Sequence, residues 1–495
     1  MLSKYKLFFG SQLTLLLLLL TLVACNKPAP PATTEAAKVI PPAAASTLIT
    51  FVTMNSPNTY FVNNDKEFAG LEYDLAKQFI FRLNKHVKTP YQMKFTVVNS
   101  IEEVMNTLES GKADIAAADL TVTDARKKII DFSIPYQDVQ QQLVFNKQMK
   151  SKPPKNAKEL VNVHLVVPAA SSFVERLTHL QQKESGIIWE ERQAVHSENL
   201  LEDVAAGDID YTIADSHLVS VLQNYHPNLG VAFALGEPEK IAWGFAKSDK
   251  KDLVSKANTF FADIKKDGTL RNLIDRYHGN AKRLNPTDIK TFLIRKNTLL
   301  PKYKRLFHQA QEISGLDWRL LAAISYQESH WDTFNTSPTN VRGLMMLTEA
   351  TSDQMGVTNR LDPKQSIPAG AKYVTQLIET MPNRIAEPDR TYMALAAYNI
   401  GYAHVEDARV LAQRLKMNPD RWADVKKTLV MLNDQRYYAN AKYGYCSGGA
   451  PVIYVESIRS YYNILERYEP AHQPNESDPY KIASNTTFDN LTAPL

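Results

Sequence analysis

The chain has 495 residues, of which 44% are hydrophobic and 22% charged, a composition typical of a folded protein too long for one ordinary core. The formal net charge is only +4, and basic residues do not gather in long runs, so nothing in the composition calls for nucleic acid. Two or three domains are therefore expected, with substrates or ligands other than nucleic acid.

The N-terminus has the pattern of an export signal. Lys4 and Lys6 precede an apolar run from residue 13 to 23, which is followed by Ala24 and Cys25. The run is too short to span a bilayer comfortably, and a small residue stands before the expected cut. We therefore expect residues 1–24 to be removed, which lowers the net charge of the mature chain to +2.

The tetrad Leu22-Val23-Ala24-Cys25 resembles the lipobox of bacterial lipoproteins. The resemblance implies cleavage before Cys25 and lipidation of this cysteine, so that the chain is anchored to a membrane through lipid. Asn26 follows, where an Asp would favour the inner membrane, and the periplasmic face of the outer membrane is therefore expected. The alternative is a plain secretory signal with an incidental cysteine.

Composition and periodicity divide the rest of the chain into five parts. Short apolar strands alternate with helical patterns in the first folded part, which indicates an α/β domain, and the later folded part is mainly helical. The expected parts are a Pro- and Ala-rich tether at 25–47, an α/β domain at 48–280, a linker at 281–301, a helical domain at 302–468 and a polar tail at 469–495.

An internal repeat lies within the α/β part. The pattern G-x-x-D-x-x-x-A-D occurs at residues 111–119 and again at 207–215, each time after a helical segment and running into an apolar strand. The repeat predicts two similar lobes. Ligands of open α/β sheets bind beyond the carboxyl ends of strands, so we expect Asp119 and Asp215 to face one cleft.

Three further segments of this part carry a family resemblance. They are GLEYDLAKQF at 70–79, TVTDAR at 121–126 and DFSIPY at 131–136, and the region ends in DGTLRNLIDRYHG. Together they resemble the family 3 periplasmic solute-binding proteins, which bind amino acids. The resemblance implies a two-lobed α/β fold over residues 48–280 that binds an amino acid or a short wall peptide (a muropeptide).

The same resemblance assigns residues to a ligand. It implies that Arg126 grips the ligand carboxylate, for which a guanidinium is well suited, and that Asp215 takes the ligand ammonium. The further expected contacts are Thr121, Thr123, Ser171, Ser172 and an aromatic wall from Tyr60 or Phe61. One departure is Asp119, which stands where the family has Gly, so an extra carboxylate is expected near the cleft.

The helical part contains one acid of particular interest. The segment DWRLLAAISYQES predicts a helix with Asp317 as its N-cap, and Leu321, Ile324 and Glu328 share one face of it. A carboxyl group on an apolar face keeps its proton more tightly, as a general acid at neutral pH requires. The alternative is an exposed acid at a frayed helix end.

Several motifs follow this acid in a fixed order. They are Ser329, GLMMLT at 343–348, SIPAGAKYVTQL at 366–377, AAYNIG at 396–401 and Tyr454-Val455. Together they resemble the soluble-lytic-transglycosylase family, with a lysozyme-like fold, over residues 302–465. The resemblance implies that Glu328 is the catalytic acid, and its implied substrate contacts are Ser337, Met345, Met346, Tyr398, Asn399 and Tyr454.

The implied reaction is cleavage of the β-1,4 bond between N-acetylmuramic acid and N-acetylglucosamine in peptidoglycan glycan strands, with formation of 1,6-anhydromuramic acid. Two alternatives stay open. The chain could be a ligand-capturing lipoprotein whose muramidase fold only attaches it to murein, or a hydrolytic muramidase with Asp332 as second acid. We expect Asp332 to be a loop or capping residue instead. No motif for a metal or another cofactor is present in the sequence.

Overall fold

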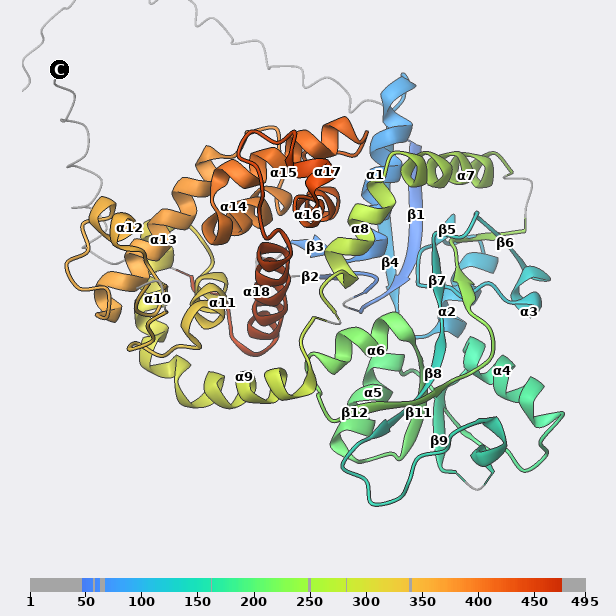
Figure 1. The fold of residues 1–495 in the computed structure, drawn as a ribbon. Helices are drawn as coiled ribbons and strands as arrows, with labels where there is room; N and C mark the ends of the chain where they lie inside the picture. Colours follow the sequence, from blue (N-terminus) through green and yellow to red (C-terminus); the bar gives the residue numbers. More distant parts are fainter. Residues whose placement is uncertain are drawn as a thin grey trace, which may run out of the picture. The chain divides into compact units, whose positions relative to one another are not determined.

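The computed structural model describes residues 47–56, 58–62, 67–161, 163–247, 251–281, 283–337 and 341–473. The predicted signal segment and Cys25 lie outside these residues. Within them the chain forms an N-terminal α/β domain of two lobes followed by a mainly helical domain (Figure 1). This is the fold class predicted from the sequence.

Lobe one of the N-terminal domain is built around a five-stranded sheet with the order β4-β1-β5-β14-β6. Its elements are β1 (Thr47–Met54), β2 (Phe61–Val62), β3 (Phe68–Ala69), α1 (Leu71–Leu83), η1 (Asn84–His86), β4 (Tyr91–Val98), α2 (Ile101–Glu109), β5 (Ile115–Ala116), α3 (Asp124–Lys127), β6 (Ile130–Phe132), β14 (Gly244–Ala246), α7 (Lys251–Lys266) and α8 (Thr269–His278).

Lobe two has its own five-stranded sheet, with the order β10-β9-β11-β8-β12. Its elements are β8 (Gln141–Asn146), η2 (Ala157–Leu160), β9 (Leu165–Pro168), α4 (Ser172–Gln181), β10 (Glu190–Arg192), α5 (Ser197–Ala206), β11 (Tyr211–Asp215), α6 (Ser216–Gln223) and β12 (Leu229–Ala234). The chain passes between the lobes at β7 (Gln137–Val139) and β13 (Glu239–Ile241), which pair antiparallel with each other.

Alternation along the strands gives each sheet two buried faces. In β1, Ile49 and Phe51 point into a core shared with helices α1, α7 and α8, and Val52 points to the opposite face, into a core shared with α2. Because side chains of a strand alternate between faces, this eight-residue strand supports both cores at once. Lobe two likewise packs α5 and α6 on one face of its sheet and α4 on the other.

The internal repeat predicted from the sequence is confirmed. Helices α2 and α5 are each followed by a glycine with positive φ, Gly111 at 69° and Gly207 at 88°, and then by the strands β5 and β11. Glycine adopts this left-handed conformation without steric cost, which allows the chain to turn sharply from the helix into the strand. After the two turns, Asp215 ends β11 and Asp119 lies three residues beyond the end of β5.

The helical domain surrounds one continuous apolar core. Its helices are α9 (Pro286–Thr298), α10 (Leu300–Ser314), α11 (Trp318–Ser329), α12 (Glu349–Gln354), α13 (Pro363–Thr380), α14 (Asp389–Ile400), α15 (Tyr402–Arg414), α16 (Trp422–Met431), α17 (Gln435–Tyr438) and α18 (Gly449–Tyr468). Helix α9 lies in the segment that we expected to be a linker, and its Ile289 and Phe292 are buried in this core. Because these two side chains are apolar, they are removed from water by packing against the neighbouring helices.

The start of the expected polar tail packs against the helical domain. Glu469 forms ion pairs with Lys296 and Lys304, and the carbonyl of Pro470 accepts a hydrogen bond from Trp318 Nε1. These contacts bind the first residues of the segment to α9, α10 and α11. Among the described residues, no helix is both long enough and apolar enough to cross a membrane.

Candidate active site and ligand cleft

Helix α11 places Glu328 in its last turn. Asp317 caps the N-terminus, because its carboxylate accepts a hydrogen bond from the Arg319 amide, as predicted. The helix ends at Ser329, since His330 adopts a positive φ of 52°. Leu321 and Ile324 are fully buried on the same side as Glu328, so the predicted apolar face of the helix is confirmed.

The carboxyl group of Glu328 meets a tyrosine rather than a second charge. Tyr454, on α18, donates its hydroxyl to Glu328 Oε1 at 2.5 Å. Burial raises the pKa of Glu328 to about 7, and the hydrogen bond from Tyr454 opposes this rise only in part. A carboxyl group with this pKa is partly protonated at neutral pH, so it can both donate its proton and take it back.

The backbone strap at 343–347 is held beside this carboxyl by hydroxyl groups. Ser325 and Ser329 both donate to the Leu344 carbonyl at 3.0 Å, and Tyr398 donates to the Met345 carbonyl at 2.6 Å. Burial raises the pKa of Tyr398 well above its usual value, and the charge of Glu328 raises it further. The Tyr398 hydroxyl and the Glu328 carboxyl group are therefore close to each other. Three of the sequence motifs therefore converge on one site.

Two glycines allow this close packing. Gly343 has φ 81°, and a Cβ there would lie 1.9 Å from the Arg360 carbonyl oxygen. A Cβ at Gly370 would lie 2.7 Å from the Met345 side chain. A larger residue at Gly343 would push the strap away from the segment before α13, where the Arg360 backbone occupies the space. A larger residue at Gly370 would push the strap away from α13 itself, because the Met345 side chain fills the space there.

The other residues predicted to contact substrate are placed unevenly. Met345 is fully buried, so it belongs to the core and not to an accessible floor, whereas Met346 is half-buried with a positive φ of 44°. Asn399 is exposed near the end of α14, and Ser337 lies in the loop after α11, where its amide donates to the Val341 carbonyl.

The position of Asp332 is as predicted. It lies beyond the end of α11, and its carboxylate accepts a hydrogen bond from the Phe334 amide at 3.0 Å. Because this oxygen caps a turn, Asp332 holds the loop in place and does not share a helix face with Glu328.

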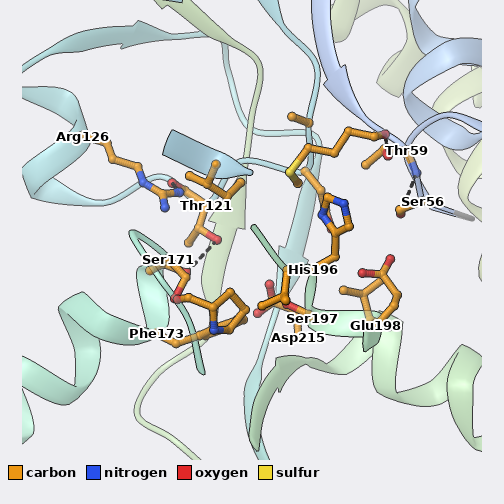
Figure 2. A pocket seen from close by; sticks show the side chains of 18 residues that line it. Ser56, Thr59, Thr121, Arg126, Ser171, Phe173, His196, Ser197, Glu198 and Asp215 are labelled. Atoms are coloured by element: carbon orange, nitrogen blue, oxygen red, sulfur yellow. Dashed lines mark hydrogen bonds between the residues drawn. The ribbon is translucent and has the colours of Figure 1, made fainter. Parts of the chain in front are cut away.

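A cavity lies between the two lobes of the N-terminal domain (Figure 2). Five residues predicted to bind a ligand line it: Thr121, Arg126, Ser171, Ser172 and Asp215. The remaining lining residues are Met54, Ser56, Thr59, Ile101, Ala118, Asp119, Pro168, Phe173, Val195, His196, Ser197, Glu198 and Leu218. Most of these remaining residues could not be predicted from the sequence, because they lie in loops and at helix starts that carry no motif.

Arg126 and Asp215 are the principal charged groups of this cavity. Arg126 is 5% exposed, donates to the Thr121 carbonyl at 3.1 Å and lies 3.5 Å from Glu175. Asp215 is equally buried, and among the described residues its Oδ1 has no hydrogen-bond partner. Burial, with the nearby carboxylates of Asp119 and Glu239, raises the pKa of Asp215 to about 7. An ammonium group would supply the missing partner.

The structure does not bring two predicted ligand residues to this cavity. Tyr60 stacks between Phe68 and Phe95, and Phe173 supplies an aromatic side chain in the cavity instead. Thr123 caps α3, because its hydroxyl accepts a hydrogen bond from the Arg126 amide. This hydrogen bond fixes the start of α3, the helix that carries Arg126.

Asp119 projects into the cavity with a positive φ of 55°, which matches the glycine found at this position in the resembling family. His217 Nε2 lies 2.8 Å from its Oδ2, and Asn58 Nδ2 donates to the same oxygen at 3.0 Å. No sequence signal links residues 58, 119 and 217, since tertiary folding alone brings them together.

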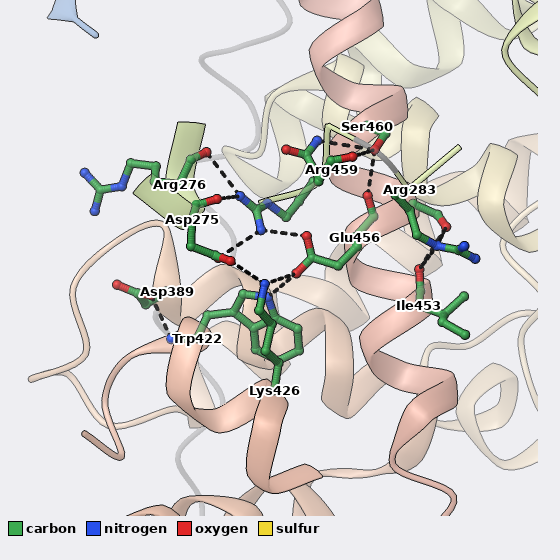
Figure 3. Close-up of polar contacts among 12 residues, drawn as sticks. Asp275, Arg276, Arg283, Asp389, Trp422, Lys426, Ile453, Glu456, Arg459 and Ser460 are labelled. Carbon is green, nitrogen blue, oxygen red and sulfur yellow. Dashed lines mark hydrogen bonds and ion pairs between the residues drawn. The ribbon is translucent and has the colours of Figure 1, made fainter. Parts of the chain in front are cut away.

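Helices α8 and α18 connect the cleft domain to the helical domain through buried charges (Figure 3). Arg459 of α18 donates to the Asp275 carbonyl at 2.7 Å and pairs with Glu456 at 2.7 Å. Lys426 of α16 forms ion pairs with both Asp275 and Glu456. Because Tyr454 is also on α18, one helix carries both the domain contact and the partner of Glu328.

Comparison with known proteins adds to these observations. Residues 48–280 match the family model of bacterial extracellular solute-binding proteins, family 3, and residues 305–420 match the Transglycosylase SLT domain. The N-terminal domain is also similar to a solved mutant of ArgBP from T. maritima, with 22% identity and a TM-score of 0.41, covering 46% of this chain and 94% of that one.

Three relatives are named membrane-bound lytic murein transglycosylase F. The one from Methylobacillus flagellatus is 55% identical over 86% of this chain and 89% of its own length. Those from Nitrosospira multiformis and Pseudomonas fluorescens are 41% and 42% identical, covering 86% and 84% of this chain and 87% and 84% of their own lengths. With such identity over most of both chains, this protein belongs to the family of the membrane-bound lytic murein transglycosylase F.

Proposed function

We propose that this protein is a peptidoglycan lytic transglycosylase and that Glu328 is its only catalytic acid and base. The observation that carries the assignment is a carboxyl group with a pKa of about 7 that accepts a hydrogen bond from Tyr454, in a domain of the SLT family. No paired acid is needed, because one carboxyl group can serve in both steps.

In the first step, protonated Glu328 donates its proton to the oxygen that links N-acetylmuramic acid to N-acetylglucosamine. The C1–O bond breaks and its electron pair stays with the leaving oxygen, while positive charge develops at C1 of the muramic ring. Tyr454 holds the carboxyl group in place through its 2.5 Å hydrogen bond and stabilises the carboxylate that forms.

In the second step, the Glu328 carboxylate takes the proton from the C6 hydroxyl of the same muramic residue. The C6 oxygen forms a bond to C1 and closes the 1,6-anhydro ring, so Glu328 is protonated again and no water is consumed. Met346, Tyr398, Asn399 and Ser337 are proposed to border the glycan, with Ser337 near the acetamido group. The acetamido group can itself stabilise the positive centre.

Mass spectrometry of digested sacculi tests this function. The protein comprising residues 26–495 is expected to release fragments ending in 1,6-anhydromuramic acid, and the Glu328→Gln variant is expected to release none. Products with a reducing muramic end would show a hydrolase instead. Absence of any cleavage by the unaltered protein would favour a murein-attachment role.

We further propose that the N-terminal cleft binds an amino acid or a muropeptide and that binding modulates the enzyme. Arg126 and the Asp215 oxygen that has no hydrogen-bond partner among the described residues are suited to the carboxylate and ammonium ends of such a ligand. The charged contacts between α8 and α18 give lobe one a direct connection to the helix of Tyr454 (Figure 3). Deleting residues 48–280 should change rate or ligand response, and an unchanged enzyme would refute modulation.

Membrane attachment is proposed to occur through a lipid on Cys25, at the periplasmic face of the outer membrane. The lipobox-like tetrad supports this, as does the name of the relatives, which calls them membrane-bound. A Cys25→Ala variant should leave the membrane fraction and lose the mass of the acyl chains. If it stays in the outer membrane, another feature anchors the protein.

A further inference from the structure

The residues that follow α18 pack against the start of α11, the helix that carries Glu328. Three backbone carbonyls of this short segment accept hydrogen bonds from side chains of α10 and α11: Glu469 from Arg319, Pro470 from Trp318 and His472 from Gln311. The Trp318 and Arg319 side chains are fully buried. We call residues 469–472 the C-terminal clamp, because they hold the first turn of α11 in place.

Gln311 connects the clamp to the helix start. Its Nε2 donates to the His472 carbonyl at 2.9 Å, and its Oε1 accepts a hydrogen bond from the Trp318 amide at 2.9 Å. Because the Trp318 amide belongs to the first turn of α11, it has no partner within the helix, and the Gln311 side chain supplies one. Loss of the clamp would release one end of Gln311 and loosen the start of the helix.

Polar contacts hold both ends of the clamp. Glu469 forms ion pairs with Lys296 of α9 at 3.4 Å and with Lys304 of α10 at 2.7 Å. At the other end, His472 Nε2 lies 3.0 Å from Glu312 Oε1, also on α10. The clamp is therefore fastened to three helices, α9, α10 and α11.

Two stacked histidines lie within this contact. The His472 ring lies 4.0 Å from the ring of His308, on α10, with the two planes 14° apart. His308 also packs edge-on against Trp318, with the ring centres 4.8 Å apart. The His308 Nε2 is buried and has no hydrogen-bond partner among the described residues. A proton on this nitrogen would therefore have no acceptor and no water beside it while the clamp is closed.

The closed clamp holds His308 neutral. Burial lowers the pKa of His308 most, and the charges of His472 and Lys304 lower it further. Glu312 and Glu469 oppose the shift only in part, so the pKa is about 4, against about 6.5 for a histidine in water. The open form binds the proton more strongly. The closed form is therefore favoured above about pH 6.5, and it loses this advantage as pH falls toward about 4.

We propose that the C-terminal clamp positions the start of α11 and opens in acid, when His308 takes up a proton. Two protonated imidazole rings stacked at 4.0 Å would repel each other, and Lys304 adds a third positive charge nearby. Opening separates the rings and admits water to His308. The first turn of α11 then loses its contacts, and Glu328 in the last turn is held less firmly. The effect on activity rests on the catalytic role proposed above for Glu328, whereas opening of the clamp does not.

The variant His308→Phe separates the stacked contact from the proton. A phenyl ring keeps an aromatic surface against His472 and Trp318 but takes up no proton. His472→Ala removes the stack from the clamp itself and should open the clamp at every pH. His164→Phe is the matched control, because His164 lies in lobe two and 55% of its side chain is exposed.

Hydrogen exchange of the protein comprising residues 26–495, corrected for the intrinsic pH dependence of exchange, measures the opening. Amides of residues 469–473 and of the first turn of α11 should lose about tenfold or more of their protection between pH 7 and pH 5. His308→Phe should lose less than about twofold, and His164→Phe should behave like the unaltered protein. His472→Ala should show low protection at both pH values. Unchanged protection of the buried helix α13 separates opening from unfolding.

Release of soluble fragments from sacculi tests the positioning role. The ratio of kcat at pH 5 to kcat at pH 6.5 should be about threefold lower in the unaltered protein than in His308→Phe. Equal ratios would refute the positioning of Glu328. Protection that does not depend on pH in the unaltered protein, or the same loss of protection in His308→Phe, would refute the acid-sensitive clamp. A protein that shows the expected exchange but cleaves at no pH would instead refute the proposed catalytic function.

Discussion

Glu328 and Asp215 are both buried carboxyl groups with a pKa raised to about 7, but their surroundings differ. Around Glu328, burial is the main cause of the raised pKa, and the hydrogen bond from the Tyr454 hydroxyl opposes it. Around Asp215, burial acts together with Asp119 and Glu239, and His217 and Arg126 oppose them. An acid without charged neighbours can give up and regain a proton, whereas an acid among charges is suited to a ligand cation.

The comparison also extends to how each site is held. The strap beside Glu328 is fixed by hydroxyl groups of one domain, so its geometry does not depend on a movable partner. The walls of the cleft come from two lobes connected by β7 and β13, and side chains of the two lobes, such as His217 and Asp119, meet there. The first arrangement favours precise chemistry, and the second favours exchange of a ligand.

The largest expected effect separates the two sites by function. Glu328→Gln should lower the release of soluble fragments from sacculi by about a thousandfold or more, because the general acid and base is lost. Asp332→Asn should retain activity within about threefold, since Asp332 only caps a turn. Comparable losses in both variants would show that two acids take part.

Loss of a charge in the cleft should affect binding and not bond cleavage. Arg126→Ala is expected to weaken binding of the preferred ligand by about a hundredfold, because a bidentate contact to its carboxylate disappears. Asp215→Asn should weaken it to a similar degree through the ammonium. Titration calorimetry measures both, and each variant should still cleave sacculi without added ligand. If both variants bound the ligand with unchanged affinity, the ligand would bind at another site.

The pH dependences of the two sites should be opposite. Glu328 must be protonated to act first, so kcat/KM should fall about tenfold per unit as pH rises above its pKa of about 7. Asp215 must be ionised to attract an ammonium, so ligand affinity should fall as pH drops below about 7. Tyr454→Phe removes the hydrogen bond that lowers the pKa of Glu328, so the fall in kcat/KM should move to higher pH. If kcat/KM and ligand affinity changed in the same direction with pH, the predicted difference between the two sites would be wrong.

The smallest expected effect is on stability. The folded pKa of Glu328 lies above its unfolded value, so its contribution to stability is complete below about pH 4.5 and is lost as pH rises to about 7. Glu328→Gln removes this loss and should stabilise the protein at pH 8 by about 1 to 3 kcal/mol, with little gain at pH 4. Thermal unfolding at the two pH values measures the difference. An equal gain in stability at both pH values would show that a change in packing, and not ionisation of Glu328, is the cause.

Much of the architecture could be predicted because its signals are local. The repeat at 111–119 and 207–215 depends on a glycine turn between helix and strand, and the face of Glu328 depends on helical spacing. Segment 281–301 was harder, since its polar composition hides Ile289 and Phe292, which only the core of the other helices buries. The prediction for Tyr60 was wrong because its ring stacks on the neighbouring rings of Phe68 and Phe95 and does not line the cavity.

The sequence by itself determined the order of the two domains, the apolar helix that carries Glu328, and the presence of Arg126 and Asp215 near one cleft. These depend on periodicity, turns and motifs of neighbouring residues. The tertiary structure alone decided that Tyr454 meets Glu328 from 126 residues away, that α8 meets α18, and that Asn58, Asp119 and His217 meet between the two lobes. Such contacts join distant segments, and only the packing of several elements together sets their distances.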